Sequence, residues 1–236
     1  MAQNIIYMKQ LKKTYVTGKV SFDALKSIDL RVDRGELIAV VGPSGSGKST
    51  LMNVIGCLDV PTGGVYKLED RVVNTLTSNE LADIRNKKVG FVFQAFNLLP
   101  YATAYENIEV PLLFAKVNGK KRRARVTELL ARVGLADKAD NKPTEMSGGE
   151  MQRTAIARAL ANNPRLILAD EPTGNLDTKS GGEIIKLFHE LWKAGHTVVI
   201  ITHDMNIAGG CQRIIKLKDG LIDNGNGNGN ISRQNT

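Results

Sequence analysis

The sequence lacks a long apolar segment of the kind that enters or crosses a membrane. No apolar run reaches the roughly 18 to 20 residues that a transmembrane helix needs. The first residues, Met1-Ala-Gln-Asn-Ile-Ile-Tyr7, lack the charged region and the long apolar region of a signal peptide. These two absences predict a protein that stays in the cytosol.

Cysteine is also scarce, with two residues in the whole chain. Cys57 and Cys211 are too few and too far apart to form a C-x-x-C metal or redox site. We therefore expect both to be free, inert thiols in a reducing compartment.

Acidic residues are fewer than basic ones, which leaves a formal net charge of +8. A basic protein suits a nucleic acid or an anionic membrane as its partner. However, the sequence shows neither a nucleic-acid-binding module nor an aromatic-rich RNA-binding pattern. The basic cluster at residues 120–125 is typical of a solvated helix face, with a surface for an anionic partner as the alternative.

The most informative stretch is a glycine-rich segment between two apolar segments. Residues 37–41 before it are apolar and mostly β-branched, which predicts a buried parallel strand. After it, Leu51, Val54, Ile55 and Leu58 have the spacing of a helix. The segment matches the pattern G-x-x-x-x-G-K-[ST]. It consists of Gly42, Pro43, Ser44, Gly45, Ser46, Gly47, Lys48, Ser49 and Thr50.

A glycine-rich loop between a strand and a helix is the context of a phosphate-binding loop. Its glycines let backbone N–H groups point inward and form an anion-binding nest at a positive helix end. Lys48 would reach the β- and γ-phosphates of a nucleotide, and the Ser49 hydroxyl would bind Mg²⁺. The alternative is a glycine-rich turn followed by a chance Lys-Ser pair.

A second candidate site follows an apolar strand predicted at residues 166–169. Asp170 ends that strand, so its carboxylate should lie at the carboxyl edge of the sheet beside the phosphate loop. Asp170 would bind Mg²⁺ directly or through a water molecule. Glu171 would orient or polarise the water that attacks the γ-phosphate. The alternative for Glu171 is a capping acid before Pro172.

A third motif, Ser147-Gly148-Gly149-Glu150, lies between the other two. It is either an ordinary helix N-cap or a second phosphate clamp made of the Ser147 hydroxyl and backbone N–H groups. One chain does not need two clamps for one phosphate. Two chains that face each other head to tail would use both.

In combination and order, these motifs resemble the ATP-binding cassette (ABC) family over residues 4 to 222. Residues 53–59, 93–100 and 169–177 resemble its lipoprotein-release, macrolide-export and antimicrobial-peptide-export branch, which includes division-associated ATPases. The family motifs are a Walker A loop at 42–50, a Q-loop at Gln94, a signature at 147–150, a Walker B strand at 166–170 followed by Glu171, a D-loop at 175–177 and a switch histidine at His203.

The resemblance implies further roles for single residues. Tyr15 would stack on the adenine of ATP, and Asp177 would act within the D-loop. Gln94 would touch Mg²⁺ and sense the membrane partner, and His203 would hold the γ-phosphate. The family signature commonly begins with Leu and ends with Gln. Here Met146 and Glu150 stand at those positions, whereas the Ser-Gly-Gly core of the signature is intact.

The expected fold class is α/β: a P-loop NTPase core of mostly parallel sheet, with an antiparallel β subdomain and an inserted helical subdomain at about 95–163. Residues 4–15 are expected to form an edge strand, and residues 213–222 a hairpin. Capping boxes are predicted at Thr77 and Glu80, for a helix to about Arg85, and at Thr103 and Glu106. The nucleotide-binding domain is expected at 1–223, and the Asn/Gly-rich tail at 224–236 is expected to be disordered.

The resemblance implies an ATPase subunit that dimerises on ATP around two ATP molecules and powers an integral membrane permease. Such a subunit would sit in the cytoplasm, peripheral on the inner face of the cell membrane, and no nucleic-acid partner is expected. A soluble clamp that acts on DNA or ribosomes is the alternative, although such proteins usually carry two cassettes or a long coiled coil. The signature and His203 argue against an ordinary P-loop kinase.

Overall fold

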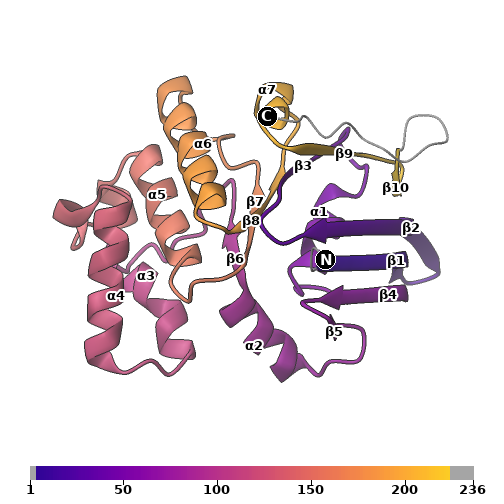
Figure 1. The fold of residues 1–236 in the computed structure, drawn as a ribbon, viewed down its shortest axis with the longest axis horizontal. Helices are drawn as coiled ribbons and strands as arrows, with labels where there is room; N and C mark the ends of the chain where they lie inside the picture. The colour runs from indigo at the N-terminus through magenta and orange to yellow at the C-terminus, as the bar shows by residue number, and fades with distance from the viewer. Residues whose placement is uncertain (1–3, 224–236) are drawn as a thin grey trace.

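Two β-sheets with helices around them make up the part of the chain that the structure describes, residues 4–223 (Figure 1). The structure is a computed structural model. The strands are β1 (Asn4–Thr17), β2 (Val20–Asp33), β3 (Leu37–Val41), β4 (Gly63–Leu68), β5 (Arg71–Val72), β6 (Val89–Val92), β7 (Leu166–Asp170), β8 (Thr197–Ile201), β9 (Arg213–Lys218) and β10 (Leu221–Ile222). The helices are α1 (Lys48–Ile55), α2 (Ser78–Lys88), α3 (Ala104–Phe114), α4 (Gly119–Arg132), α5 (Gly148–Ala159), α6 (Thr178–Lys193) and α7 (Met205–Gly209), with the 3₁₀ turns η1 (Ala136–Lys138) and η2 (Pro143–Glu145).

The larger sheet has the strand order β10-β9-β3-β8-β7-β6. Its pairs are parallel from β9 to β6, and β10 joins the edge as the antiparallel arm of a hairpin. Every residue of β3 and β8 is buried, as expected for apolar strands covered on both faces. The predicted mostly parallel core and the predicted hairpin are both confirmed.

The smaller sheet is antiparallel and has the order β2-β1-β4-β5. The expectation that residues 4–15 form an edge strand is wrong, because β1 lies between β2 and β4 and pairs with both. Apolar side chains of β1 such as Ile6 and Leu11 are fully buried, so this strand supplies the core of its sheet. An alternation of apolar and polar residues with a period of two does not by itself distinguish an inner strand from an edge strand.

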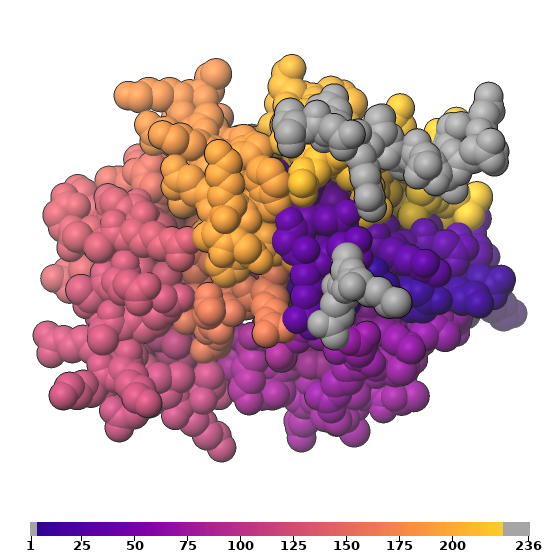
Figure 2. All heavy atoms as spheres, in the orientation of Figure 1, coloured from indigo at the N-terminus to yellow at the C-terminus, as the bar shows by residue number. Residues whose placement is uncertain are grey.

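Helices cover the two faces of the parallel sheet differently, as Figure 1 shows. Ile38 and Val40 of β3 belong to a core shared with α1, α2 and the antiparallel sheet. Leu37 and Ala39 of the same strand point the other way, into a core shared with α3 to α6. In Figure 2, α3 and α4 form one flank of the molecule, and the antiparallel sheet forms the opposite flank.

Local helix signals are confirmed, with shifts at the ends. Both predicted capping boxes are present, although α2 continues past Arg85 to Lys88. The helix after the phosphate loop is shorter than predicted. It ends at Ile55 and is capped by Gly56, so Leu58 lies beyond it and is 48% exposed. The prediction was too long because the helical spacing of apolar residues continues to Leu58, past Gly56, the glycine at which the helix ends.

Residues 95–163 hold α3, α4 and α5 and the two 3₁₀ turns, with no strand among them. The basic cluster lies on α4, but it is not uniformly solvated. Arg122 pairs with Glu109 at 2.8 Å, and Arg125 donates to the carbonyls of Leu160 and Ala161 at the end of α5. These two arginines therefore join helices.

Cys57 and Cys211 are free and buried, as predicted. Burial raises the pKa of each thiol to about 12, which keeps both protonated and unreactive at neutral pH. Among residues 4–223, no helix is both long enough and apolar enough to cross a membrane. The predicted disordered tail at 224–236 lies outside the described residues.

Candidate nucleotide-binding site

The glycine-rich segment forms a loop between β3 and α1, as its flanking residues predict. Gly47 has a φ of 102°, which side-chain-bearing residues rarely adopt, and a Cβ there would lie 2.6 Å from the Ala24 carbonyl oxygen. A Cβ on Gly42 would overlap the Leu217 backbone. Both glycines are therefore required by geometry, and α1 starts directly after the second one with its N-terminus at the loop.

Lys48 folds back over this loop. Its Nζ donates to the carbonyl oxygens of Gly42 and Pro43, at 2.8 Å each. The ammonium group thus lies above the nest of backbone groups, where the phosphates of a nucleotide would bind. Beside it, the buried Ser46 Oγ has no hydrogen-bond partner among the described residues. Ser49 is exposed, and Thr50 is half-buried.

Asp170 ends β7, and Glu171 follows it at the carboxyl edge of the sheet. Burial raises the pKa of Asp170, the neighbouring Glu171 raises it further, and the positive charge of Lys48 opposes both effects. Lys48 of the phosphate loop is therefore close enough to Asp170 to act on its carboxylate, and the Mg²⁺ role of Asp170 stays a prediction. Glu171 has a φ of 42°, a conformation that stores strain in a residue with a side chain and that clusters at functional sites.

The Glu171 side chain is fixed by the segment after β8. Its Oε2 accepts a bond from the Thr202 hydroxyl at 3.1 Å. Its Oε1 accepts a bond from the backbone N–H of His203 at 3.0 Å and lies 2.7 Å from Nδ1 of the His203 ring. The His203 side chain is 78% exposed. The structure thus joins the two residues predicted to be catalytic, and their catalytic role stays a prediction.

Gln94 follows β6 and contacts the D-loop. Its Nε2 donates to Asn175 Oδ1 at 3.4 Å, and Asn175 Nδ2 donates to the Gln94 backbone oxygen at 3.0 Å. A Cβ on Gly174 would lie 2.7 Å from the Gln94 Nε2, so a larger residue there would have to displace the Gln94 side chain. Asp177 caps α6 by accepting a bond from the backbone N–H of Ser180 at 3.0 Å. The prediction that Gln94 and Asp177 act near a nucleotide stays a prediction.

Ser147 lies at the N-terminus of α5, a helix that packs on the other face of the sheet from α1, and a Cβ on the neighbouring Gly148 would lie 3.2 Å from the Leu176 side chain of the D-loop. It forms a capping box with Glu150, whose Oε2 accepts bonds from the Ser147 N–H at 2.8 Å and its hydroxyl at 3.0 Å. These bonds lower the pKa of Glu150. Gly148 and Gly149 form the first turn of α5, with Gly149 buried. The N-cap is therefore real, and a clamp role for Ser147 stays a prediction.

Tyr15 lies near the end of β1, where it is 37% exposed. Its hydroxyl donates to Asp59 Oδ2 at 2.9 Å. Lys13 Nζ lies 4.9 Å from the centre of the Tyr15 ring and also contacts Asp59. Sequence reasoning assigned no role to Lys13 and Asp59, since 46 residues separate them and no local spacing links the two.

The residues predicted to bind Mg²⁺ are few. No group of three or more His, Cys, Asp or Glu side chains suited to a metal occurs within residues 4–223. However, Asp170 and Glu171 place two carboxylates beside one Lys48, which leaves an excess of negative charge that a divalent cation would neutralise. This donor set fits Mg²⁺ that is held jointly by protein oxygens and by the phosphates of a nucleotide.

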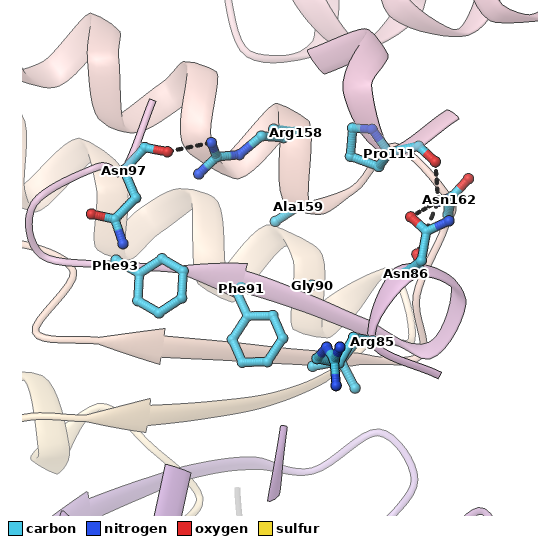
Figure 3. Close-up of a pocket in the computed structure, with 11 residues that line it drawn as sticks. Arg85, Asn86, Gly90, Phe91, Phe93, Asn97, Pro111, Arg158, Ala159 and Asn162 are labelled. Atoms are coloured by element: carbon cyan, nitrogen blue, oxygen red, sulfur yellow. Dashed lines mark hydrogen bonds between the residues drawn. The ribbon is translucent and has the colours of Figure 1, made fainter. Parts of the chain in front are cut away.

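A pocket of about 270 Å³ lies between α2, β6, α3 and α5, and Phe93, the residue before Gln94, is part of its lining (Figure 3). The rings of Phe91 and Phe93 stack along one wall at 5.6 Å between their centres. On the opposite side, Arg158 of α5 donates to the carbonyl oxygens of Asn97 and Phe96, at 2.5 and 3.0 Å. The remaining lining is mixed: Arg85, Asn86 and Asn162 are polar, whereas Val89, Gly90, Pro111 and Ala159 are not.

Comparison with known proteins agrees with this geometry. Residues 25–174 match the family model described as ABC transporter. The chain is 50% identical over 218 residues to the uncharacterized ABC transporter ATP-binding protein YvrO of Bacillus subtilis, covering 92% of this chain and 95% of that protein. It is 48% identical over 219 residues to the macrolide export ATP-binding/permease protein MacB of Mannheimia succiniciproducens, covering 93% of this chain. The chain spans about a third of the length of that relative, 34%.

Solved structures give the same result. The dimeric structure of a post-hydrolysis state of the ATP-binding cassette MJ0796, bound to ADP and Pi, aligns with a TM-score of 0.85 and 48% identity. The alignment covers 92% of this chain and 96% of that one. A P-loop α/β fold with one parallel and one antiparallel sheet is therefore shared with an ATP-hydrolysing cassette.

Proposed function

The chain belongs to the ABC transporter family and carries its ATP-hydrolysing domain, and from this we propose that its ATP cycle powers an integral membrane permease. The observation that carries the ATP-hydrolysis part of this proposal is the Glu171–His203 contact at the carboxyl edge of the sheet. It supports a site in which an acid and a histidine, both held by hydrogen bonds, act on the γ-phosphate that Lys48 would bind.

We assign the following roles to the site residues. Lys48 and the backbone N–H groups of residues 42–50 bind the β- and γ-phosphates, and Tyr15 stacks on the adenine. Glu171 orients the attacking water, and His203, whose ring is exposed, contacts the γ-phosphate. Ser49, Asp170 and Gln94 would hold Mg²⁺, which supplies charge neutralisation of the phosphates when it is bound.

We further propose that two copies of the chain enclose two ATP molecules. The phosphate loop leads into α1 and the exposed Ser147 begins α5, and these two helices pack in cores on different faces of the sheet, which favours their use on different nucleotides. A two-fold pair would bring Ser147, Gly148 and Gly149 of each chain to the ATP of the other. The name of the MJ0796 structure describes that relative as dimeric, which supports this arrangement.

The permease is proposed to dock on the flank formed by the helices of residues 95–163, over the pocket near Gln94. Tyr101 and Leu99 are 90% and 50% exposed there, and Asn97 lines the pocket itself. The protein would then act at the cytoplasmic face of the cell membrane as a peripheral subunit. The name of MacB, which contains both ATP-binding and permease parts, supports an export role of this kind.

The first test is hydrolysis by Glu171→Gln. The amide keeps the size of the side chain and can still bond Thr202 and His203, but it cannot act as a base. We expect Mg-ATP binding to persist while turnover falls by about 10²- to 10⁴-fold, the usual contribution of a positioned acid–base group. Glu190→Gln, at an exposed position on α6, is the matched control and should keep wild-type turnover. Near-normal turnover by Glu171→Gln would remove this residue from the catalytic role.

A further inference from the structure

The surroundings of Tyr15 contain two residues that the proposed function does not use, Lys13 and Asp59. Lys13 is only 7% exposed, which is unusual for a lysine and requires a partner for its charge. Its Nζ contacts Asp59 Oδ1 at 2.5 Å and donates to the Val60 carbonyl oxygen at 2.9 Å. This pair is therefore a built feature and not a loose surface ion pair.

Asp59 uses both of its carboxylate oxygens. Oδ1 accepts bonds from Lys13 and from the backbone N–H of Val60, and Oδ2 accepts the Tyr15 hydroxyl. Burial alone would raise the pKa of Asp59, but the bonds from Lys13 and Tyr15 outweigh this effect and hold the pKa below its ordinary value. The carboxylate is thus charged at neutral pH, and charge-assisted bonds of this kind are about twice as strong as neutral ones.

The Tyr15 ring is held from two directions as a result. Its hydroxyl is fixed by Asp59, and Lys13 lies over the ring at 4.9 Å from the ring centre. A ring that is covered by a cation on one face and fixed at its hydroxyl keeps its other face for a planar group.

Asp59 connects the Tyr15 ring to the phosphate loop through helix α1. Helix α1 begins at Lys48, and the backbone N–H of Asp59 donates to the Asn53 carbonyl oxygen of that helix at 3.1 Å. Tyr15, by contrast, comes from the antiparallel sheet. The Tyr15–Asp59 bond therefore sets the position of a residue on one sheet relative to the loop at the start of α1.

We infer that Asp59 and Lys13 are positioning residues that hold the Tyr15 ring at a defined distance from the phosphate loop, so that base and phosphates of one nucleotide bind together. This inference rests on the proposed role of Tyr15 as the adenine platform. Asp59 would then contribute to the affinity for the base of the nucleotide and would not contribute to the affinity for its phosphates.

The test compares Mg-ADP with Mg-pyrophosphate, which lacks the base, by titration calorimetry on the full chain. Tyr15→Phe removes only the hydroxyl and leaves the Lys13–Asp59 pair intact, so it tests the bond without unpairing a buried charge. We expect Tyr15→Phe and Asp59→Ala each to raise the Kd for ADP by about 3- to 10-fold, the value of one hydrogen bond, and to leave the Kd for pyrophosphate unchanged. Asp59→Asn, which keeps an acceptor, should recover part of the affinity.

Two further variants complete the design. The double variant Tyr15→Phe with Asp59→Ala should bind ADP no more weakly than the weaker single variant, because both remove the same bond. Tyr7→Phe, on the same strand β1 but with its ring against Arg31, is the matched control and should bind ADP as the wild type does.

Three results would overturn the inference. Wild-type ADP affinity in both Tyr15→Phe and Asp59→Ala would do so, and so would equal losses for ADP and pyrophosphate or additive losses in the double variant. The variant Tyr15→Ala distinguishes failure of the positioning role of Asp59 and Lys13 from failure of the proposed function of Tyr15. If Tyr15→Ala weakens ADP binding while Asp59→Ala and Tyr15→Phe do not, the positioning role alone is wrong. If Tyr15→Ala also binds ADP normally, Tyr15 is not the base platform.

Discussion

His196 is a buried histidine that should make the folded chain sensitive to acid. Its side chain is almost fully covered, and its Nδ1 lies 2.7 Å from the Pro164 carbonyl oxygen. Burial lowers the pKa of this imidazole, and the charges of Arg132 and Arg125 lower it further, although the contact with Pro164 opposes them. In the unfolded chain these effects are lost, and the pKa returns to its ordinary value of about 6.5.

The sign of the pH dependence follows from this difference. Below about pH 6.5 the unfolded chain takes up a proton that the folded chain resists, so stability is full above that pH and falls as the pH drops through it. Urea unfolding between about pH 7.5 and about pH 5 should show this fall, and His196→Gln should reduce its slope. His189→Gln, which removes a histidine from α6, should retain the wild-type slope. Equal slopes in the wild type and His196→Gln would contradict the prediction.

Some site residues can be predicted from sequence because their role depends on local spacing. Lys48 and Glu171 are examples, since a loop after one parallel strand and an acid at the end of another must meet at the same sheet edge. Asp59 and Lys13 could not be found in this way. Their contact depends on how the antiparallel sheet sits against the end of α1, which no local pattern specifies.

For helices and strands, the sequence signals that predicted correctly are those whose hydrogen bonds join residues only a few positions apart. The boxes of Thr77 and Thr103 each bond a glutamate three positions later, so no distant contact is needed. The place of β1 inside its sheet was predicted wrongly, because β4 follows it by almost fifty residues. Division of the chain at 1–223, with a helical subdomain at about 95–163, remains a prediction.

The helical flank supports a prediction about partner contact. Replacing Tyr101 with benzoylphenylalanine should give light-dependent crosslinks to an integral membrane protein when the tagged chain is isolated from membranes. The reason is that Tyr101 is 90% exposed and follows Asn97, which lines the pocket, in the segment after Gln94. An element so placed would move when ATP closes the site.

The control for this experiment uses the opposite flank. Leu221, which is 43% exposed on β10, should give no such crosslink when it carries the same group. Crosslinks to a membrane protein from Leu221 but not from Tyr101 would place the docking surface elsewhere and would contradict the assignment made here.

At the scale of the whole molecule, the proposed pair of chains can be tested by its response to nucleotide. Glu171→Gln should be monomeric with Mg-ADP and dimeric with Mg-ATP in gel filtration with light scattering. ATP joins the chains because its γ-phosphate reaches the Ser147 hydroxyl of the other copy, whereas ADP leaves that clamp empty. Adding Ser147→Arg should restore the monomer without preventing ATP binding.

The Ser147→Arg change also removes a helix cap, which costs about 1 kcal/mol of stability on its own. Thr77→Arg removes the equivalent cap of α2, at an exposed position, and is the matched control. It should leave the ATP-dependent dimer intact in the Glu171→Gln background. A Glu171→Gln chain that stays monomeric at saturating Mg-ATP, or a Ser147→Arg form that dimerises equally well, would exclude the shared clamp.

Arg158 gives this arrangement a mechanical consequence. It lies on the same continuous helix as the Ser147 cap, and its guanidinium holds the carbonyl oxygens of Phe96 and Asn97. The helix is thus a rod of about 16 Å, at 1.5 Å per residue, with one end at the clamp and the other at the pocket. A tilt of this rod would move both ends at once. If ATP binding changes the affinity of the pocket for its occupant by some factor, thermodynamic reciprocity requires that the occupant changes the affinity for ATP by the same factor.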